Sequence, residues 1–197
     1  LYAQLHPAEQ SKPIHDLVQQ AETLILKVSD LVLYCNDEDL KAFRKMRPDA
    51  GFADMYAPNG MQSVISSRLN ARVSSNKFRA VFMGSGHPPN VDAAIFIAKK
   101  LAAQLPQIDF DIIGSCLPQG RYPSNVHRHG VASDAVKEQI LAVANLALNP
   151  MATGSGSNVK VLDYFAHGLP VLSTSFGMRG INAQAGHDYL EAELDEF

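Results

Sequence analysis

A repeating cycle constrains the fold of this chain more than any other feature. From residue 79 onward, a short apolar run is followed by a polar turn and then by apolar residues at helical spacing, and the cycle then starts again. Short continuous apolar runs are typical of strands buried on both faces. Strands that alternate with helices are joined by right-handed crossovers and form a parallel sheet. We therefore predict an α/β fold in which helices cover both faces of a parallel sheet of about six strands.

The elements of this cycle can be placed from its periodicity. The first strand is expected at residues 79–83, and an apolar helical stripe then extends from Val91 to Leu105, with Asn90 as its N-terminal cap. Further strands are expected at residues 110–113, 126–129, 146–148 and 171–174, with helices from residue 133 and over residues 158–167.

The N-terminal part of the chain shows a shorter version of the same alternation. The expected elements are a helix over residues 8–29, a strand over 31–35, a helix from Asp37 that ends at Pro48, and a strand over 52–57. Residues 61–76 follow a Pro-Asn-Gly turn signal and are rich in Ser, Asn and Arg with weak periodicity. We expect a domain boundary in this stretch and divide the chain into residues 1–65 and 66–197.

Composition excludes several classes of protein. The 197 residues are 46% apolar and carry a net charge of −3, so the chain is too apolar for disorder and too polar for a membrane bundle. The balanced charge offers no basic stripe for a polyphosphate backbone, so we expect no nucleic acid as a partner. Cys35 and Cys116 form neither a disulfide framework nor a zinc spacing, which favours a reducing compartment and hence a cytoplasmic location. Because the chain begins at Leu1 and stops in an acidic segment at Phe197, we expect it to be a fragment.

Glycine and serine cluster at the expected strand ends. The turns include Gly84-Ser85-Gly86, Gly114-Ser115, Gly130 and residues 173–177. In parallel sheets ligands bind beyond the carboxyl ends of the strands. For any single turn, the small residues are better explained by tight geometry alone. Their recurrence along one edge favours a ligand site there.

The most informative segment is a glycine-rich loop before the expected helix over residues 158–167. The loop consists of Gly154, Ser155, Gly156, Ser157 and Asn158, and Lys160 lies in the first turn of the helix. Backbone amides at a helix N-terminus bind phosphate or diphosphate, and a lysine adds a point charge. The spacing matches neither a Walker motif nor the dinucleotide fingerprint.

Taken in order, these motifs resemble those of the family 4 glycosyltransferases. The resemblance covers nearly the whole chain and rests on Val-Phe-Met-Gly with Pro-Asn-Val-Asp-Ala, on His-Gly-Val at residues 129–131, and on the segment from Gly154 to Val171. It implies two Rossmann-like domains that face each other across a cleft. Residues 1–65 would be the last part of the N-terminal, acceptor-side domain with its linker. Residues 66–197 would be the donor-binding domain, truncated before its last helix, with residues 188–190 as a late strand.

The resemblance implies transfer of a sugar from a nucleoside-diphosphate sugar to a carbohydrate or lipid-linked acceptor, with retention of the anomeric configuration. It also implies a role in polysaccharide biosynthesis. It implies no cofactor and no metal. The groups that contact the acceptor would lie in the missing N-terminal part, as would any membrane contact, so no catalytic residue is assigned and the fragment alone is expected to be inactive. The implied donor-binding residues are Gly84, Ser85, Gly86, His87, Gly130, Val131, Gly154, Ser155, Gly156, Ser157, Asn158, Lys160 and Asp163.

Two departures from the family pattern bear on this site. The family has a pair of glutamates at the positions of Ser155 and Asp163. Asp163 can still accept hydrogen bonds from both ribose hydroxyls, whereas Ser155 supplies no negative charge beside the sugar. The usual Arg and Lys after the first strand are replaced by His87-Pro-Pro-Asn90, so binding of the diphosphate would depend on backbone amides, Lys160 and His87.

Other functions stay open. A non-catalytic accessory or nucleotide-binding subunit would explain Ser155, and an epimerase with the same architecture would need further carboxylates. Individual residues also have simpler explanations. His87 fits an exposed turn as well as a phosphate contact, and His127 and His129 share one face of a strand, where a structural role is commoner than a metal site. His167 is expected in the last turn of its helix, where it is favourable with the dipole.

Overall fold

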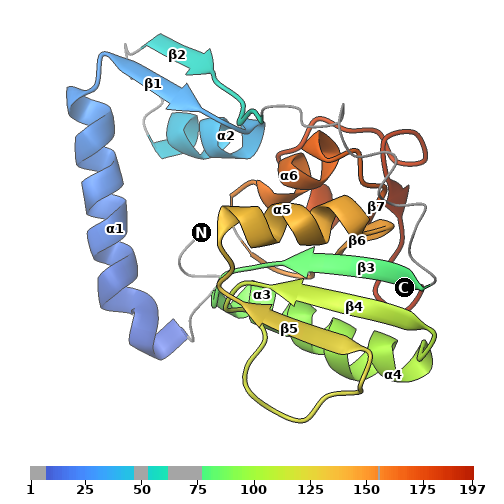
Figure 1. Cartoon of the computed structure of the whole chain (residues 1–197). Helices are drawn as coiled ribbons and strands as arrows, with labels where there is room; N and C mark the ends of the chain where they lie inside the picture. Colours follow the sequence, from blue (N-terminus) through green and yellow to red (C-terminus); the bar gives the residue numbers. More distant parts are fainter. Residues whose placement is uncertain (1–7, 47–52, 62–76, 155) are drawn as a thin grey trace. The chain divides into compact units, whose positions relative to one another are not determined.

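The computed structural model describes residues 8–46, 53–61, 77–154 and 156–197 (Figure 1). The chain forms two compact units, of which the first comprises Leu1–Gly60 with Gly154–Ser157 and the second Met61–Thr153 with Asn158–Phe197. The boundary predicted between residues 65 and 66 lies outside the described residues, as do Phe52 and Ser155. None of the described helices combines the length and the apolar content needed to cross a bilayer.

The first unit has the helix–strand–helix–strand order that the sequence predicts. Its elements are α1 (Ala8–Val28), β1 (Leu31–Tyr34), α2 (Asp37–Met46) and β2 (Ala53–Tyr56). The two strands pair in parallel. Helix α2 begins where the Asn36 side chain accepts a hydrogen bond from the Asp39 amide at 2.9 Å. Its far end is joined to β2 by an ion pair of 2.6 Å between Arg44 and Asp54.

The second unit is built on a six-stranded, fully parallel sheet. Its strands are β3 (Phe78–Met83), β4 (Ile108–Ile113), β5 (Val126–Gly130), β6 (Leu146–Asn149), β7 (Val171–Ser173) and β8 (Leu190–Glu191). They lie in the order β5-β4-β3-β6-β7-β8. Numbered within the sheet, this is the Rossmann order, in which the strand order reverses between the first and fourth strands. The predicted Rossmann-like parallel sheet is therefore confirmed.

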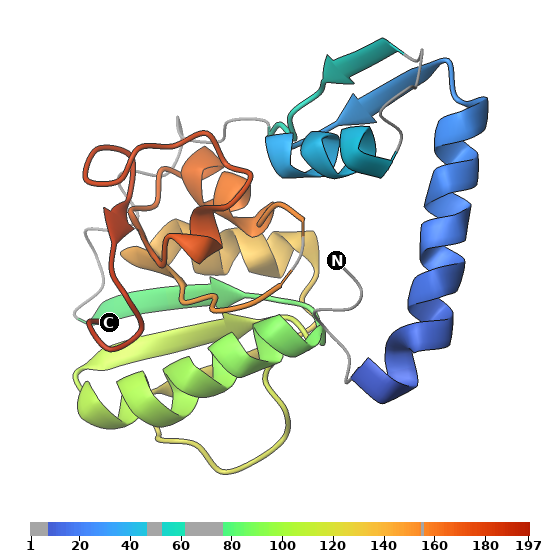
Figure 2. The ribbon, with the colours of Figure 1, turned by 180° about the vertical axis from the view of Figure 1, so that it is seen from behind.

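Helices cover both faces of this sheet, and alternate residues of β3 belong to two separate cores. Ala80 and Phe82 pack on one face, and Val81 and Met83 pack on the other. The first face is covered by α3 (Pro88–Phe96), a π-helical segment η4 (Ile97–Leu101) and α4 (Ala102–Gln104), which run on from one another (Figure 2). The other face is covered by α5 (Asp134–Val143) and α6 (Lys160–Ala166).

Two predicted helix starts are wrong. Asn90 does not cap α3, because that helix begins two residues earlier, with His87 at the cap and prolines in its first turn. Proline fits the first turn because its fixed φ is helical. It also lacks the backbone N–H that would have no acceptor within the helix at this position. Helix α6 begins at Lys160 instead of Asn158. The amide of Val161 donates to the Asn158 carbonyl at 2.9 Å, which makes the entry to α6 a tight turn.

Helix α6 is joined to the end of β3 by a buried hydrogen bond. The Met83 amide donates to the Tyr164 hydroxyl at 2.8 Å, and Tyr164 is fully buried. The next amide, of Gly84, donates toward β4, to the Ile113 carbonyl. Because successive amides of a strand point to opposite sides, the Met83 amide faces β6, whose pairing with β3 ends at Val81. Tyr164 therefore satisfies a strand amide that the sheet leaves without a partner.

We predict that Tyr164→Phe lowers the free energy of unfolding by about 1–3 kcal/mol, because it leaves that buried amide without an acceptor. Tyr122→Phe is a matched control, since the Tyr122 hydroxyl bonds to the Pro118 carbonyl at an exposed site. Denaturant unfolding of both variants measures the difference. Equal losses of stability in the two variants would contradict the assigned role of Tyr164.

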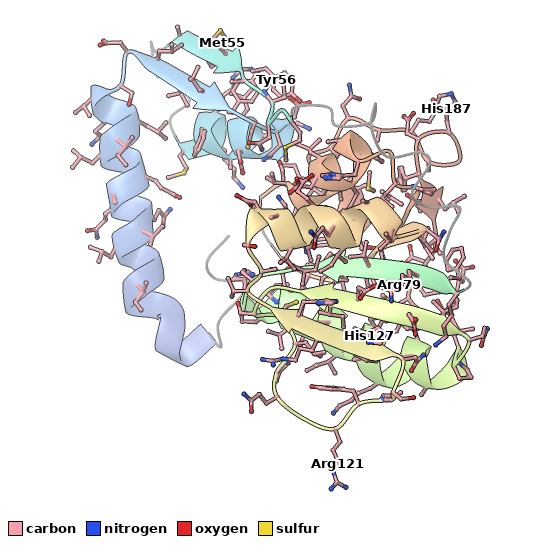
Figure 3. The ribbon with its side chains drawn as sticks, in the orientation of Figure 1. Met55, Tyr56, Arg79, Arg121, His127 and His187 are labelled. Carbon is pink, nitrogen blue, oxygen red and sulfur yellow. The ribbon has the colours of Figure 1, made fainter. Side chains whose placement is uncertain are left out.

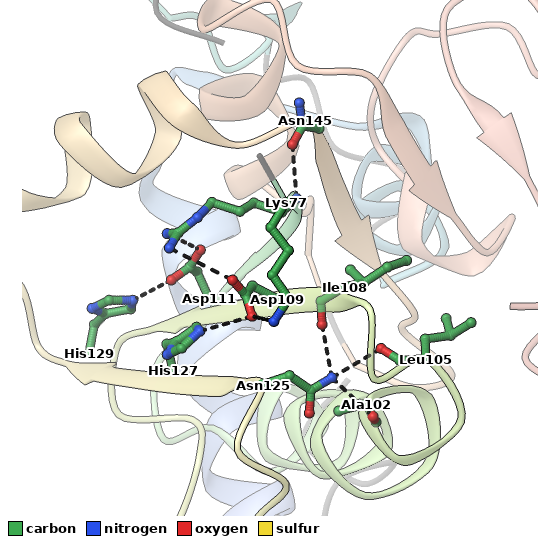
Figure 4. A network of polar contacts seen from close by, with 11 residues as sticks. Lys77, Ala102, Leu105, Ile108, Asp109, Asp111, Asn125, His127, His129 and Asn145 are labelled. Carbon is green, nitrogen blue, oxygen red and sulfur yellow. Dashed lines mark hydrogen bonds and ion pairs between the residues drawn. The ribbon is translucent and has the colours of Figure 1, made fainter. Parts of the chain in front are cut away.

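A layer of charged side chains lies across β3, β4 and β5 (Figures 3 and 4). Asp109 accepts a hydrogen bond from Lys77 at 2.6 Å and lies 3.3 Å from His127 Nε2. Asp111, which is 1% exposed, accepts one from Arg79 at 3.1 Å. Its other carboxylate oxygen lies 2.7 Å from His129 Nε2.

This layer explains the two strand histidines. They share a face, as predicted, and each lies beside a carboxylate of the neighbouring strand. No group of three possible metal ligands occurs among the residues that the structure describes. A structural role in pairing β5 with β4 therefore accounts for His127 and His129.

Burial by itself would raise the pKa of Asp109, but the hydrogen bond from Lys77 and the nearby His127 ring hold it below its ordinary value. The stabilisation from this carboxylate is therefore complete above its unfolded pKa, about 3.8, and is lost as the pH falls through the lower folded value. We predict that Asp109→Asn costs roughly 1–2 kcal/mol at pH 7 and that the cost disappears in strong acid. Urea unfolding across this range tests the prediction, with the exposed Asp134→Asn as control. A cost that did not change with pH would contradict it.

Candidate functional site

The turns after β3, β4 and β5 lie against one another through their backbones. The Gly84 amide donates to the Ile113 carbonyl at 3.0 Å, and the Gly114 amide donates to the Gly130 carbonyl at 2.6 Å. Gly114 has a φ of +99°, and a Cβ there would overlap the Gly84 carbonyl. A Cβ on Gly84 would lie 2.8 Å from the Cβ of Asn90. Gly114 is therefore required by the close approach of the Gly84 backbone, and Gly84 by the side chain of Asn90.

The point where the strand order reverses lies between β3 and β6, and Lys160 reaches the end of β3 from the start of α6. Its Nζ donates to Asn90 Oδ1 at 2.5 Å. The same nitrogen lies 3.7 Å from the sulfur of Met151 and 4.6 Å from the centre of the Phe82 ring. Asn90 in turn donates to the Ser85 hydroxyl at 3.3 Å. Asn90 thus links Lys160 to Ser85 in the turn after β3, at the edge where ligands bind in such sheets.

Lys160 is a positive charge in a largely apolar environment. Burial lowers its pKa to about 8, an effect that the nearby Cys116 partly offsets. The Cys116 thiol is itself buried, which raises its pKa. Within the described residues no carboxylate pairs with Lys160, so its charge is available to an anion from outside the chain.

We predict that Lys160→Met increases the free energy of unfolding at pH 7 by roughly 1–3 kcal/mol, because it removes a charge that burial disfavours. Between pH 8 and 10.5 the folded wild type has lost a proton that the unfolded chain still holds, so its stability rises with pH. The difference in the free energy of unfolding between Lys160→Met and wild type should therefore shrink between pH 8 and 10.5. Denaturant titrations from pH 7 to 10.5 measure it, with the exposed Lys99→Met as control. A variant less stable than wild type at pH 7 would contradict the prediction.

The glycine-rich loop is anchored at its C-terminal end. Gly154 and Gly156 have positive φ values, of 136° and 67°. The side-chain Nδ2 of Asn158 donates to the Gly177 carbonyl at 2.8 Å. The side-chain Nδ2 of the fully buried Asn149 donates to the same oxygen at 2.8 Å. The NH₂ group of Asn158 thus holds the loop after β7, and the predicted contact of Asn158 with the donor stays a prediction. Ser155 lies outside the described residues.

Asp163 has a partner within the protein. One carboxylate oxygen lies 3.6 Å from the Nζ of Lys137 on α5, and the side chain is 20% exposed. That distance is an ion pair and is too long for a direct hydrogen bond. Helix α5 therefore supplies a counter-charge for Asp163, so its place on an otherwise apolar helix does not by itself require a ligand. Its predicted contact with a ribose stays a prediction.

The other predicted residues occupy different surroundings. His87 is the exposed cap of α3, and its carbonyl accepts the Asn90 amide. Gly130 ends β5 with a φ of +64°, and Val131 is 85% exposed. His167 follows the last residue of α6, and its Nε2 also lies 3.1 Å from a carboxylate oxygen of Glu138 on α5, so it joins the two helices.

Sequence reasoning missed Asn90 and Tyr164 as parts of this site. The sequence pattern predicts Asn90 as a helix cap, although the two prolines before it are a signal that the helix begins earlier. Tyr164 falls in an apolar pattern that also fits an ordinary core residue, so no local signal distinguishes it.

Several solved structures share this fold. Anabaena Alr3699/HepE, solved with UDP and glucose, superposes with a TM-score of 0.69 at 16% identity, over 100% of this chain and 58% of that one. The pneumococcal O-GlcNAc transferase GtfA, solved with UDP and GlcNAc, gives a TM-score of 0.60 at 14% identity, over 87% and 36% of the two chains. WaaG, a glycosyltransferase involved in lipopolysaccharide biosynthesis, gives a TM-score of 0.52 at 18% identity, over 76% of this chain and 45% of the WaaG chain.

At these identities the likeness establishes the fold alone, and the chain spans 58% of the length of the HepE structure that it matches. No curated protein sequence is significantly similar to the chain. A sequence model described as "Glycosyl transferases group 1" matches residues 77–196, which include the whole β3–β8 sheet. Because this match covers more than half of the chain, the protein belongs to the glycosyl transferases group 1 family.

Proposed function

We propose that the protein transfers a sugar from a nucleoside-diphosphate sugar and that the second unit binds the donor. The observation that carries the proposal is the placement of Lys160, a half-buried cation without a carboxylate partner among the described residues, beside Asn90 and the turn that follows β3. Nucleotide ligands bind at this edge in Rossmann-like sheets. Two proteins of similar fold were solved with UDP and a sugar.

Lys160 would act on the leaving group. When the bond to the sugar breaks, negative charge develops on the departing diphosphate, and a fixed cation in a poorly hydrated site stabilises that charge more strongly than one in water. With a pKa of about 8, Lys160 is mostly protonated at pH 7. The exposed turn at Ser85 and Gly86 would add backbone amides, and Asp163 would bind the ribose.

The finer parts of the proposal follow from the resemblance noted above. They are membership of family 4, retention of configuration without a metal or an organic cofactor, and a carbohydrate or lipid-linked acceptor bound by the N-terminal domain, as in polysaccharide biosynthesis. The free thiols Cys35 and Cys116 support the proposed cytoplasmic location.

We predict that Lys160→Ala weakens binding of UDP about 10- to 100-fold, the effect expected for losing a charged contact to a phosphate. Asp163→Asn should weaken it by a similar factor, with less effect on folding. Isothermal titration calorimetry measures both, and Lys99→Ala, which removes an exposed lysine of η4, is the control. If Lys160→Ala bound UDP as tightly as wild type, the donor site would be misplaced.

A non-catalytic accessory or nucleotide-binding subunit is the second candidate. It is favoured by the serine at position 155, where the resemblance implies a glutamate. Slow hydrolysis of a nucleoside-diphosphate sugar by the whole protein distinguishes the two. Release of free sugar supports a transferase, whereas tight binding of UDP without hydrolysis supports the accessory subunit.

A further inference from the structure

We infer that Asn90 is a positioning residue: its side-chain amide holds the Lys160 ammonium at the turn after β3, where the diphosphate would bind. The inference deepens the proposed function and rests on it. It begins from the fact that Asn90 touches both groups that matter, the lysine from α6 and the serine of the turn.

The two ends of the amide have different tasks. Oδ1 accepts from Lys160 Nζ at 2.5 Å, and Nδ2 donates to Ser85 Oγ at 3.3 Å. Asparagine is suited to this place because one short side chain carries an acceptor and a donor without adding charge. An aspartate would neutralise the lysine, and so remove the attraction for an anion.

Asn90 is itself held in place. It lies in the first turn of α3, where its amide donates to the His87 carbonyl at 2.9 Å and where two prolines before it restrict the backbone. Its Cβ occupies the space into which a side chain at Gly84 would project. The absence of a side chain at Gly84 is therefore a condition for the placement of Asn90.

Lys160 requires such a partner. A lysine side chain has many rotamers, and the Phe82 ring and the Met151 sulfur attract its ammonium without fixing its direction. Asn90 provides a short, directional hydrogen bond. Without it, the ammonium would sample orientations that do not face the turn.

The first experiment uses no nucleotide. NMR of ¹³Cε-labelled lysine follows the titration of Lys160 in wild type and in the nearly isosteric Asn90→Asp. If the two side chains touch in solution, the new carboxylate raises the titration midpoint of Lys160 by about 1 unit or more. An unchanged midpoint would overturn the inference even if UDP binds.

The second experiment is a double-mutant cycle on UDP affinity, with Asn90→Ala, Lys160→Ala and the double variant. We expect Asn90→Ala to weaken binding about 5- to 10-fold and to add nothing in the Lys160→Ala background. Asn182→Ala, at an exposed site of the second unit, is the control. Additive effects would show that Asn90 does not act through Lys160 and would overturn the inference. If Lys160→Ala alone has no effect on affinity, it is the proposed donor site that fails, and with it the role of Asn90 toward a diphosphate.

Discussion

The structure of the second unit depends on how α6 meets the end of β3. Two contacts made from one helix reach that strand and its turn: the Tyr164 hydroxyl satisfies the Met83 amide, and Lys160 reaches Asn90. Both lie where the order of the strands reverses, between β3 and β6. The first contact fixes the helix against the sheet. The second can therefore place a positive charge at the carboxyl edge of the strands, where ligands bind in sheets of this kind.

Lys160 is half-buried, and the partial loss of water around its charge makes it costly for folding. Burial lowers the pKa of Lys160, which means that the folded protein holds the charged form at the expense of stability. By contrast, Asp111, the most deeply buried acid of the sheet, has an arginine and a histidine beside it. Asp111 is therefore paired within the fold, whereas Lys160 pairs with no carboxylate in the part of the chain that the structure describes, which is why we propose that an anionic ligand binds beside it.

The sheet could be predicted from the sequence because each strand is a continuous apolar run followed by a polar turn. Residues 79–83 and 146–148 needed no knowledge of distant partners, and the structure lengthens these strands by only one residue each. The contacts of the site could not be predicted in the same way. The bond from Lys160 to Asn90 joins residues 70 positions apart, and Asp163 meets its counter-charge only because α5 packs beside α6. Local patterns do not contain such pairings.

The most direct test of the account is a crystal structure of the protein with UDP bound. We expect the diphosphate at the turn of residues 84–86, within hydrogen-bond reach of Lys160 Nζ, and Asn90 still in contact with this lysine. Density for the nucleotide at the opposite edge of the sheet, or a diphosphate bound beside β3 with Lys160 still remote from it, would contradict the account.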